Sequence, residues 1–441
     1  METPRSVPGL GRLRRAKLPT VAERVLPSGL RVVAVRRPSV PVVHLRLRVP
    51  TAVRRDTDLA KAGLLEHTML LGTADRSQSE IADALQRIGG SLRASSDADR
   101  LVLAGECLAP GLADLLGLLA EVLTEATYPR DEVQREAGRL ADLLGRRLSQ
   151  PGVVADETWL RQAFGSHPYG REYPSPDEVL AVSPASLRSA HRRRLVPEGS
   201  LLVLVGDLSP ARALDRVEGA LSGWESDGSA TTVPKVPAMV PGPLRLVDRP
   251  GAVQSNLRIG GPALPRTDPD HPAQELANAV FAGPFSSRLV QNIREDKGYT
   301  YSPRSTLHHN GRASFTLLQA DVATEVTAPA LVEVGYELGR IVSLPPTEEE
   351  LGSMAQHLVG VLALSTSTQA GLAGTLTALL AEGLDVSWLR EHPRRLLAVT
   401  PEQVHAAAQR ILAPATRLTT VVGDASVVEG PLRGLGAVEL V

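Results

Sequence analysis

The sequence of 441 residues predicts an α+β protein made of two homologous halves joined by a linker. Three observations predict this fold class. Short segments with the period-2 alternation of strands are mixed with longer segments of helical periodicity. Residues 182–207 align without a gap to residues 399–424, at a constant offset of 399 − 182 = 217, and both copies read as helix, proline-stopped turn and closing strand. Residues 225–243, between the copies, are rich in linker-forming Ser, Thr, Pro and Gly.

We therefore expect a disordered basic arm over residues 1–19, an N-terminal half over 20–224, a linker over 225–243 and a C-terminal half over 244–441. The arm has no apolar segment like that of a secretory signal, and no segment approaches membrane-spanning length. The 48 basic residues balance 49 acidic ones, so no polyanionic partner is indicated. Cys107 is the only cysteine, which excludes an intramolecular disulfide. We expect a cytoplasmic protein that binds neither nucleic acid nor membrane.

In the N-terminal half, residues 29–35 and 41–49 alternate like two antiparallel strands that turn at 38–39. The further elements expected in this half are helices over 59–72, 77–88, 112–127, 130–147, 153–164 and 184–194, and strands over 91–96, 101–107 and 201–205. The second half repeats this order in outline. It is expected to hold strands over 244–247 and 255–260, then helices, a strand pair, and long helices from Thr324 onward.

The helix expected over residues 59–72 carries Glu66 and His67 among apolar residues. Burying such side chains without partners costs on the order of several kcal/mol, so the pair requires an explanation. One explanation is a buried, hydrogen-bonded pair retained for packing. The other is a shared or unusual metal site. Of the two, the packing interpretation is favoured.

This helix resembles the zinc helix of the insulinase/pitrilysin-type metallopeptidases, the inverzincins, whose motif is H-x-x-E-H. The two His of that motif lie at i and i+4 on one helix face and bind one ion, and its Glu is the general base for the metal-bound water. Glu66 and His67 match the end of the motif, but Gly63 stands at the position of the first His. The zinc motif is therefore degenerate.

The family's third zinc ligand is a Glu on a later helix, seven residues after another Glu. Glu136 matches the earlier Glu, which places Leu143 at the ligand position. Asp142 is one residue away, and neighbouring helical residues point about 100° apart, so it does not substitute without a change of register. Because His67 alone cannot hold a catalytic zinc ion, we expect no metal cofactor in this chain.

The resemblance extends over nearly the whole chain, from residues 28–30 through 168–170 to the Val-Gly-Asp sequences at 205–207 and 422–424. It implies the short form of this superfamily. In that form each half is an α/β sandwich, with an antiparallel-rich sheet flanked by helices, and the two halves make a clam-like half-chamber.

A second stretch, residues 286–302, resembles the R/Y motif of the same family, and Arg294 and Tyr301 correspond to its pair. Ser286 can cap a helix that ends near 297–298, after which a strand is expected from Tyr299. In the family the Arg and Tyr contact the substrate backbone and help to stabilise the oxyanion. A guanidinium and a phenol suit this role because both are hydrogen-bond donors that can be fixed in place.

The structural alternative is that Arg294 pairs with Glu295 or Asp296 on a solvated helix end, while Tyr301 merely fills a strand. The length of the match to the family pattern favours the functional interpretation. The neighbouring His308 and His309 suggest a metal site, but adjacent strand residues face opposite sides, so we do not expect them to share an ion.

The resemblance implies a function. Some bacterial members are two-chain enzymes in which one subunit carries the zinc motif and the other carries the R/Y pair. We interpret this chain as the second kind: inactive alone, without its own cofactor, and completed by a homologous zinc-bearing partner that cleaves peptides. The mitochondrial processing peptidase also pairs active and inactive subunits. However, its inactive subunit has a long Gly-rich loop, whereas the corresponding segment here, 282–285, is short.

Two alternatives remain open. The chain could be a non-enzymatic structural subunit, similar to the core subunits of respiratory bc1 complexes, which share the fold and the loss of zinc ligands. It could also be a solo pseudo-peptidase that binds peptides without cutting them. Arg294 and Tyr301 argue against the structural alternative.

Overall fold

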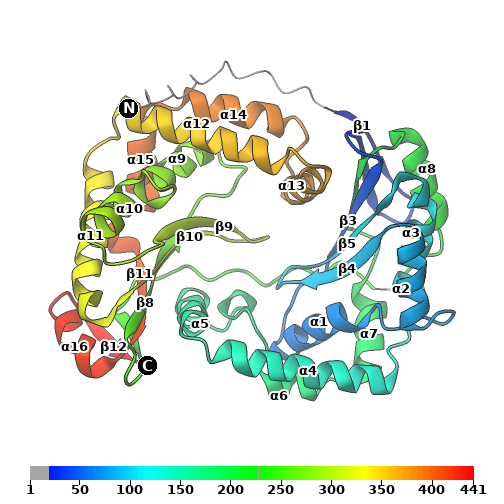
Figure 1. The fold of residues 1–441 in the computed structure, drawn as a ribbon, viewed down its shortest axis with the longest axis horizontal. Helices are drawn as coiled ribbons and strands as arrows, with labels where there is room; N and C mark the ends of the chain where they lie inside the picture. Colours follow the sequence, from blue (N-terminus) through cyan, green and yellow to red (C-terminus); the bar gives the residue numbers. More distant parts are fainter. Residues whose placement is uncertain (1–18, 227) are drawn as a thin grey trace, which may run out of the picture.

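The computed structural model describes residues 19–226 and 228–441, so all but the last residue of the arm expected over 1–19 lies outside the described residues. Two six-stranded mixed sheets, one in each half of the chain, form the framework. Figure 1 shows the two halves facing one another, with helices around both sheets. The α+β class with two sandwich-like halves is confirmed. No helix of the described residues is long and apolar enough to span a lipid bilayer.

The N-terminal half ends with α8, before the linker. Its elements are β1 (Thr20–Val25), β2 (Arg31–Arg36), β3 (Val42–Pro50), α1 (Asp56–Thr68), α2 (Gln78–Arg87), β4 (Ser91–Ser96), β5 (Arg100–Leu108), α3 (Leu112–Glu125), α4 (Arg130–Leu148), α5 (Pro151–Phe164), α6 (Pro176–Leu180), α7 (Pro184–Arg194), β6 (Leu201–Gly206) and α8 (Pro210–Ala220).

The C-terminal half has a similar order, except that its edge strand, β12, comes last in the chain instead of first. Its elements are β7 (Leu244–Asp248), β8 (Gln254–Pro262), α9 (His271–Ala282), α10 (Arg288–Val290), a π-helical turn (Gln291–Asp296), β9 (Arg304–His309), β10 (Ser314–Ala323), α11 (Thr327–Ser343), α12 (Glu348–Ser365), α13 (Gln369–Ala381), α14 (Trp388–Ala398), α15 (Pro401–Ile411), β11 (Leu418–Gly423), α16 (Ala425–Arg433) and β12 (Val438–Leu440).

The internal repeat of the sequence corresponds to a structural repeat. The strand orders are β1-β2-β6-β3-β5-β4 and β12-β7-β11-β8-β10-β9, so β6 and β11 occupy the same place in their sheets. The offset of 217 residues carries β6 onto β11 residue for residue, at 201–206 and 418–423. It also carries α5 to residues 368–381, and α13 spans Gln369–Ala381.

The two strands expected over residues 29–35 and 41–49 are present as β2 and β3, but they are not hydrogen-bonded to each other. β6 lies between the two strands, parallel to β2 and antiparallel to β3. Every residue of β6 is buried, so this apolar strand takes the centre of the sheet, where both faces and both edges are covered. The edge strand β1 was not predicted, because none of its residues is fully buried and its pattern carries little apolar signal.

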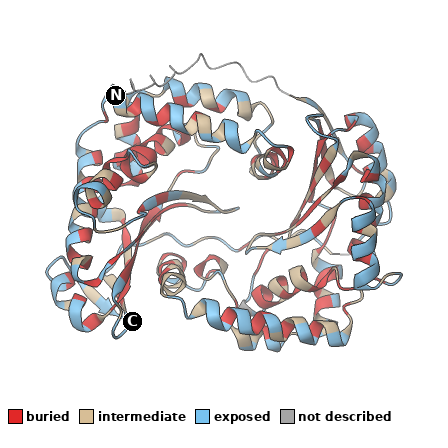
Figure 2. Cartoon of the chain, viewed as in Figure 1, coloured by how far each residue is buried: buried red, intermediate tan, exposed pale blue. Residues whose placement is uncertain are grey.

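Each sheet has one face covered by a helix from the other half of the chain. α13 packs on the N-terminal sheet, and α5 packs on the C-terminal sheet (Figure 2). The residues joined in the first contact are Val33, Val35, Leu201, Val203 and Val205 with Leu372, Ala373, Leu376 and Leu380. Those in the second are Trp159, Ala163, Phe164 and Tyr169 with Phe315, Leu317 and Leu418. Since both contacts are apolar and buried, neither half completes its core alone.

Trp159 is the largest side chain in the contact between α5 and the C-terminal sheet. It is fully buried, and its indole Nε1 donates to the carbonyl of Leu418 at 3.2 Å. The sheet accommodates the ring because position 260 is a glycine. A Cβ atom on Gly260 would lie 2.4 Å from Cζ2 of Trp159 and 2.4 Å from the carbonyl oxygen of Thr316. Such approaches are closer than van der Waals contact allows, so the backbone of β8 must stay bare at this point.

We expect Gly260→Ala to lower the free energy of unfolding by about 1–3 kcal/mol, the usual cost of overpacking. A matched control is Gly335→Ala in α11, where a Cβ would meet nothing within 4 Å. That change should stabilise the protein by up to about 1 kcal/mol, because alanine is the better helix former. Chemical denaturation measures both. Equal effects of the two substitutions would contradict this account of the contact.

Candidate functional site

A cavity of about 580 Å³ lies between the two halves, and the degenerate zinc motif forms part of its wall. Gly63, Glu66 and His67 reach it from α1, and Leu143 reaches it from α4. The opposite wall comes from β9 and β10 of the C-terminal half and includes His308, Phe315, Leu317 and Gln319. The structure therefore brings together all four positions that the resemblance assigned to the zinc motif.

Glu66 and His67 form a hydrogen-bonded, half-buried group. Oε2 of Glu66 accepts from the backbone N–H and the hydroxyl of Ser96, at 2.5 and 2.8 Å. Oε1 lies 3.4 Å from Nε2 of His67. Burial raises the pKa of Glu66, while the Ser96 hydrogen bonds and His67 oppose that shift. Because Glu66 ties α1 to the edge strand β4, these contacts support the packing interpretation of the pair.

The residues at the family's zinc position do not fit a zinc ion. Gly63 has no ligand atom, and a Cβ there would have only Leu140 Cδ2 near it, at 4.0 Å. Leu143 turns an apolar side chain to the cavity and is 40% exposed. Asp142 does not line the cavity, and Glu136 pairs with Arg139 at 2.7 Å. Among the described residues, no group of three or more His, Cys, Asp or Glu side chains is placed to hold a metal.

Arg294 and Tyr301 contact each other, although neither lines this cavity. The guanidinium carbon of Arg294 lies 4.7 Å from the centre of the Tyr301 ring, a cation–π distance. Nε of Arg294 also lies 3.2 Å from Oε1 of Glu295, which is the ion pair of the structural alternative. Tyr301 is 80% exposed, so it does not serve as a core residue.

The local structure around the pair differs from the expectation in two respects. The strand expected from Tyr299 begins only at Arg304, because Gly298 adopts φ +65° and Pro303 has no N–H to donate to a sheet. The helix before it is a π-helical turn, in which the N–H of Lys297 donates to the carbonyl of Asn292 at 3.1 Å. Single π turns are frequent at functional sites. Tyr299 packs against the C-terminal core, while Tyr301 extends into solvent.

A half-buried ion pair fixes the base of the helix that leads to Arg294. Nε and Nη2 of Arg288 donate to the two carboxylate oxygens of Glu350 on α12, at 2.8 and 2.9 Å. Arg288 is 8% exposed. The hydrogen bonds from Arg288 lower the pKa of Glu350 to about 2. Bidentate pairing of this kind holds orientation as well as charge.

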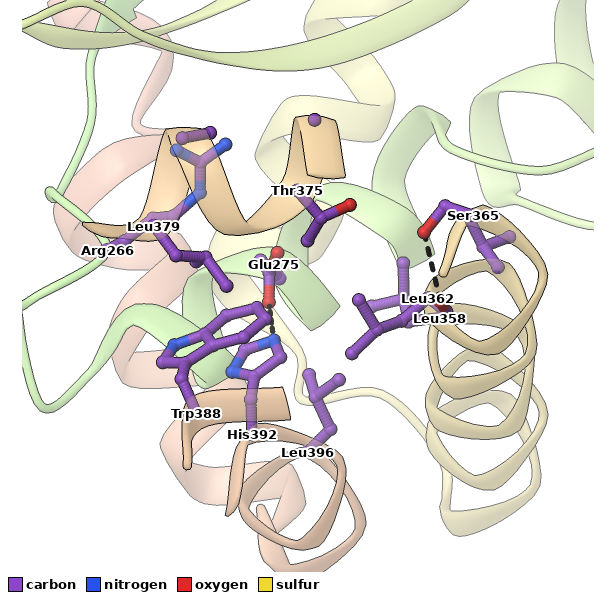
Figure 3. Close-up of a pocket in the computed structure, with 13 residues that line it drawn as sticks. Arg266, Glu275, Leu358, Leu362, Ser365, Thr375, Leu379, Trp388, His392 and Leu396 are labelled. Atoms are coloured by element: carbon purple, nitrogen blue, oxygen red, sulfur yellow. Dashed lines mark hydrogen bonds and ion pairs between the residues drawn. The ribbon is translucent and has the colours of Figure 1, made fainter. Parts of the chain in front are cut away.

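A second cavity, of about 420 Å³, lies among α9, α12, α13 and α14. Figure 3 shows Glu275 and His392 joined at its edge, with the indole of Trp388 stacked on the histidine. Nε2 of His392 lies 2.7 Å from Glu275, and Nε2 of His271 lies 3.5 Å from it. Burial disfavours the charged form of Glu275, but the two histidines outweigh it and lower its pKa.

Sequence reasoning missed this buried cluster. Only the spacing of His271 and Glu275, one helical turn apart, signals it, while His392 is far away in the sequence. The rings of His308 and His309, which the sequence places next to one another on a strand, have different neighbours. His308 stacks on Phe315 with ring centres 4.7 Å apart, whereas His309 packs against His271 at 5.3 Å. Burial, with Arg266 nearby, lowers the pKa of His309 to about 3.

Two sequence profiles of one family match the chain. The profile described as Insulinase (Peptidase family M16) matches residues 31–177, and the one described as Peptidase M16 inactive domain matches residues 181–358. The chain belongs to the M16 insulinase family. The boundary between the two matches falls within the N-terminal half, before α7.

Several curated bacterial proteins resemble this M16 chain. An uncharacterized zinc protease of Streptomyces coelicolor is 24% identical over 414 residues, which are 91% of this chain and 89% of that protein. One of Mycobacterium tuberculosis is 27% identical over 412 residues, covering 88% of this chain and 90% of the relative. One of Bacillus subtilis is 26% identical over 278 residues, covering 62% and 67%.

Solved structures share the fold. A structure described as peptidase M16 inactive domain from Pseudomonas fluorescens superposes with a TM-score of 0.83, at 22% identity, covering 92% of this chain and 98% of that chain. A protease from Helicobacter pylori gives a TM-score of 0.84 at 18% identity, covering 92% and 100%. At these identities the likeness establishes the M16 fold alone.

We expect the combined substitution Gly63→His with Leu143→Glu to create a zinc site with His67, because both positions face the same cavity and Gly63 has room for a side chain. Elemental analysis after dialysis should find about one zinc ion per chain, as a three-ligand site requires. The matched control, Gly63→His with Leu143→Gln, should hold far less. Near-stoichiometric zinc in the unmodified protein would contradict our interpretation of the motif.

We expect Glu350→Gln to destabilise the protein near neutral pH by about 1.5–3 kcal/mol, the range for hydrogen bonds to charged groups. The folded-state pKa of Glu350 is depressed from 4.5 to about 2. Its contribution is therefore fully present above about pH 4.5 and is lost as the pH falls toward 2. Denaturation of the two proteins between pH 7 and 2 measures this. A difference that does not shrink in acid would refute the assignment.

Proposed function

We propose that this chain is the non-zinc subunit of a heterodimeric M16 metallopeptidase that cleaves peptides. Arg294 and Tyr301 would contact the substrate in a site completed by a homologous zinc-bearing subunit. The observation that carries the proposal is the contact between the exposed Tyr301 and Arg294, which lies on an anchored helical segment, in a chain with Gly63 and Leu143 at two zinc-ligand positions.

Packing in the core does not explain a tyrosine at position 301. Its ring is 80% exposed, and within the described residues its hydroxyl has no hydrogen-bond partner. An exposed tyrosine contributes little to a core, whereas at an interface it offers apolar area and one donor. A phenol held beside a guanidinium can donate to a substrate carbonyl.

The contacts of the Arg294 guanidinium support the same role. Its Nε faces Glu295, while in the described part of the chain Nη1 and Nη2 have no hydrogen-bond partner. These N–H groups can donate to the oxygen that becomes negative when water attacks a peptide carbonyl. Donors fixed before the reaction stabilise that charge without reorganisation.

The partner would supply the zinc ion, its ligands and the general base, because Gly63 and Leu143 occupy two of the three ligand positions in this chain. The names of the Streptomyces and Mycobacterium relatives describe zinc proteases, which supports this class of reaction. A stable complex of two such chains should bury more than about 1,200 Å² in total.

The chain's own cavity favours a second candidate, a pseudo-peptidase that binds peptides without cutting them. The cavity is lined by residues of both halves, among them Glu66, His67, Tyr169 and Phe315. A peptide bound there would need no zinc. Activity that appears only on mixing two chains separates the two functions.

We expect this chain and its zinc-bearing homologue to cleave peptides together and not separately. In the mixture, Tyr301→Phe and Arg294→Lys should each lower the rate by roughly 10²–10³-fold, the usual cost of losing one oxyanion donor. Lysine keeps the charge but lacks the planar fork. Peptide cleavage measured with matched zinc content and matched complex formation gives the test.

Tyr299→Phe is the control, because it removes the hydroxyl of a nearby tyrosine that packs on the core. It should change the rate much less. If Tyr301→Phe assembles normally and cuts at the wild-type rate, the substrate role of the pair is wrong. If the zinc-bearing chain is fully active alone, this subunit is at most a regulator.

A further inference from the structure

Arg294 contacts a second aromatic ring that lies outside the predicted R/Y pair. Its guanidinium carbon lies 4.6 Å from the centre of the Phe285 ring, as close as it lies to Tyr301 at 4.7 Å. The guanidinium thus contacts two rings. Phe285 precedes the helical segment 288–296 in the sequence, and Tyr301 follows it. Both distances are within cation–π range, and a planar guanidinium can stack on an aromatic face.

Phe285 is held in place by its backbone. It belongs to the connection between α9 and α10, the two helices labelled at the left of Figure 1. The side-chain amide of Gln291 donates from Nε2 to the carbonyl oxygen of Phe285 at 2.9 Å. The backbone N–H of Ser287 donates to the carbonyl of Pro284, also at 2.9 Å. The loop is therefore fastened to the same π-helical turn that carries Arg294.

Burial does not explain a phenylalanine at this position. The side chain is 53% exposed and belongs to no buried cluster of the described residues. A large apolar side chain in solvent contributes little to folding, so its contact with Arg294 is the interaction that distinguishes it.

The contacts around Arg294 leave one part of it available. The rings of Phe285 and Tyr301 contact the guanidinium, and Oε1 of Glu295 lies 3.2 Å from its Nε. Nη1 and Nη2 have no hydrogen-bond partner among the described residues. A guanidinium donates only in its own plane, so fixing the plane also fixes the direction in which these amino groups donate.

We infer that Phe285 is a positioning residue, which holds the guanidinium of Arg294 so that its two amino groups face the substrate oxygen. This inference rests on the proposed function of Arg294. Phe285 itself touches no substrate. It acts by reducing the number of orientations that Arg294 samples before the reaction, which is the preorganisation that oxyanion stabilisation requires.

The first experiment needs no partner. Crystal structures of the wild-type chain and of Phe285→Leu would be compared at the Arg294 side chain. We expect a single guanidinium orientation in the wild type and several, or weak density, in the variant. Tyr336→Leu, a change at another exposed aromatic of the same half, is the matched control and should leave Arg294 ordered. An unchanged, single Arg294 orientation in Phe285→Leu would overturn the inference.

The second experiment measures kcat and KM in the reconstituted pair. Phe285→Leu should lower kcat by about two- to fivefold, the factor for an exposed cation–π contact, with KM nearly unchanged. Phe285→Tyr keeps a ring and should restore the rate. In a chain that already carries Arg294→Lys, Phe285→Leu should have no further effect, because a residue acting through Arg294 has nothing left to position.

The outcomes separate the two claims. If Arg294→Lys and Tyr301→Phe leave the rate unchanged, the proposed function fails. If they lower it while Phe285→Leu has no effect on kcat, only the positioning role fails. Equal losses from Phe285→Leu in the presence and absence of Arg294→Lys would show that Phe285 acts independently of Arg294, which also contradicts the inference.

Discussion

The exchange of helices between the two halves is the contact on which the rest of the structure depends. Each sheet leaves one apolar face open to the other half, and α5 and α13 close these faces reciprocally. Because the burial of apolar area is the main favourable contribution to folding, each half needs the other to complete its core. The bare backbone at Gly260 that admits Trp159 shows how closely this contact is fitted.

The same exchange sets the place of the cavity with the degenerate zinc motif. Packing α5 on the C-terminal sheet brings β9 and β10 opposite α1, so the cavity has the degenerate zinc motif on one wall and His308 and Phe315 on the other. The R/Y pair lies elsewhere. Arg294 lies on a helical segment fastened to α12 by Arg288 and Glu350, and Tyr301, in the connection that follows, is exposed to solvent. An oriented pair outside the chain's own cavity suits a site completed by another chain.

Much of the fold could be predicted because it is encoded locally. The helix over 184–194 follows from its cap and periodicity, and the repeat follows from direct similarity between the halves. Strand neighbours could not be predicted in the same way. β6 enters between β2 and β3 from far along the chain, and the exposed β1 leaves no apolar pattern. Motif spacing predicted roles for Gly63, Leu143, Arg294 and Tyr301, whereas no spacing encodes the contact between Phe285 and Arg294.

The central claim is that the exposed pair belongs to a site shared with a second subunit, and photo-crosslinking tests it most directly. A photoreactive phenylalanine analogue at position 301, introduced into the chain in its native cells, reports which molecule lies against that side chain. We predict a cross-link to a homologous chain of similar size with an intact H-x-x-E-H motif, or to a peptide bound in its site. Cross-links confined to this chain, or to unrelated proteins only, would contradict the account.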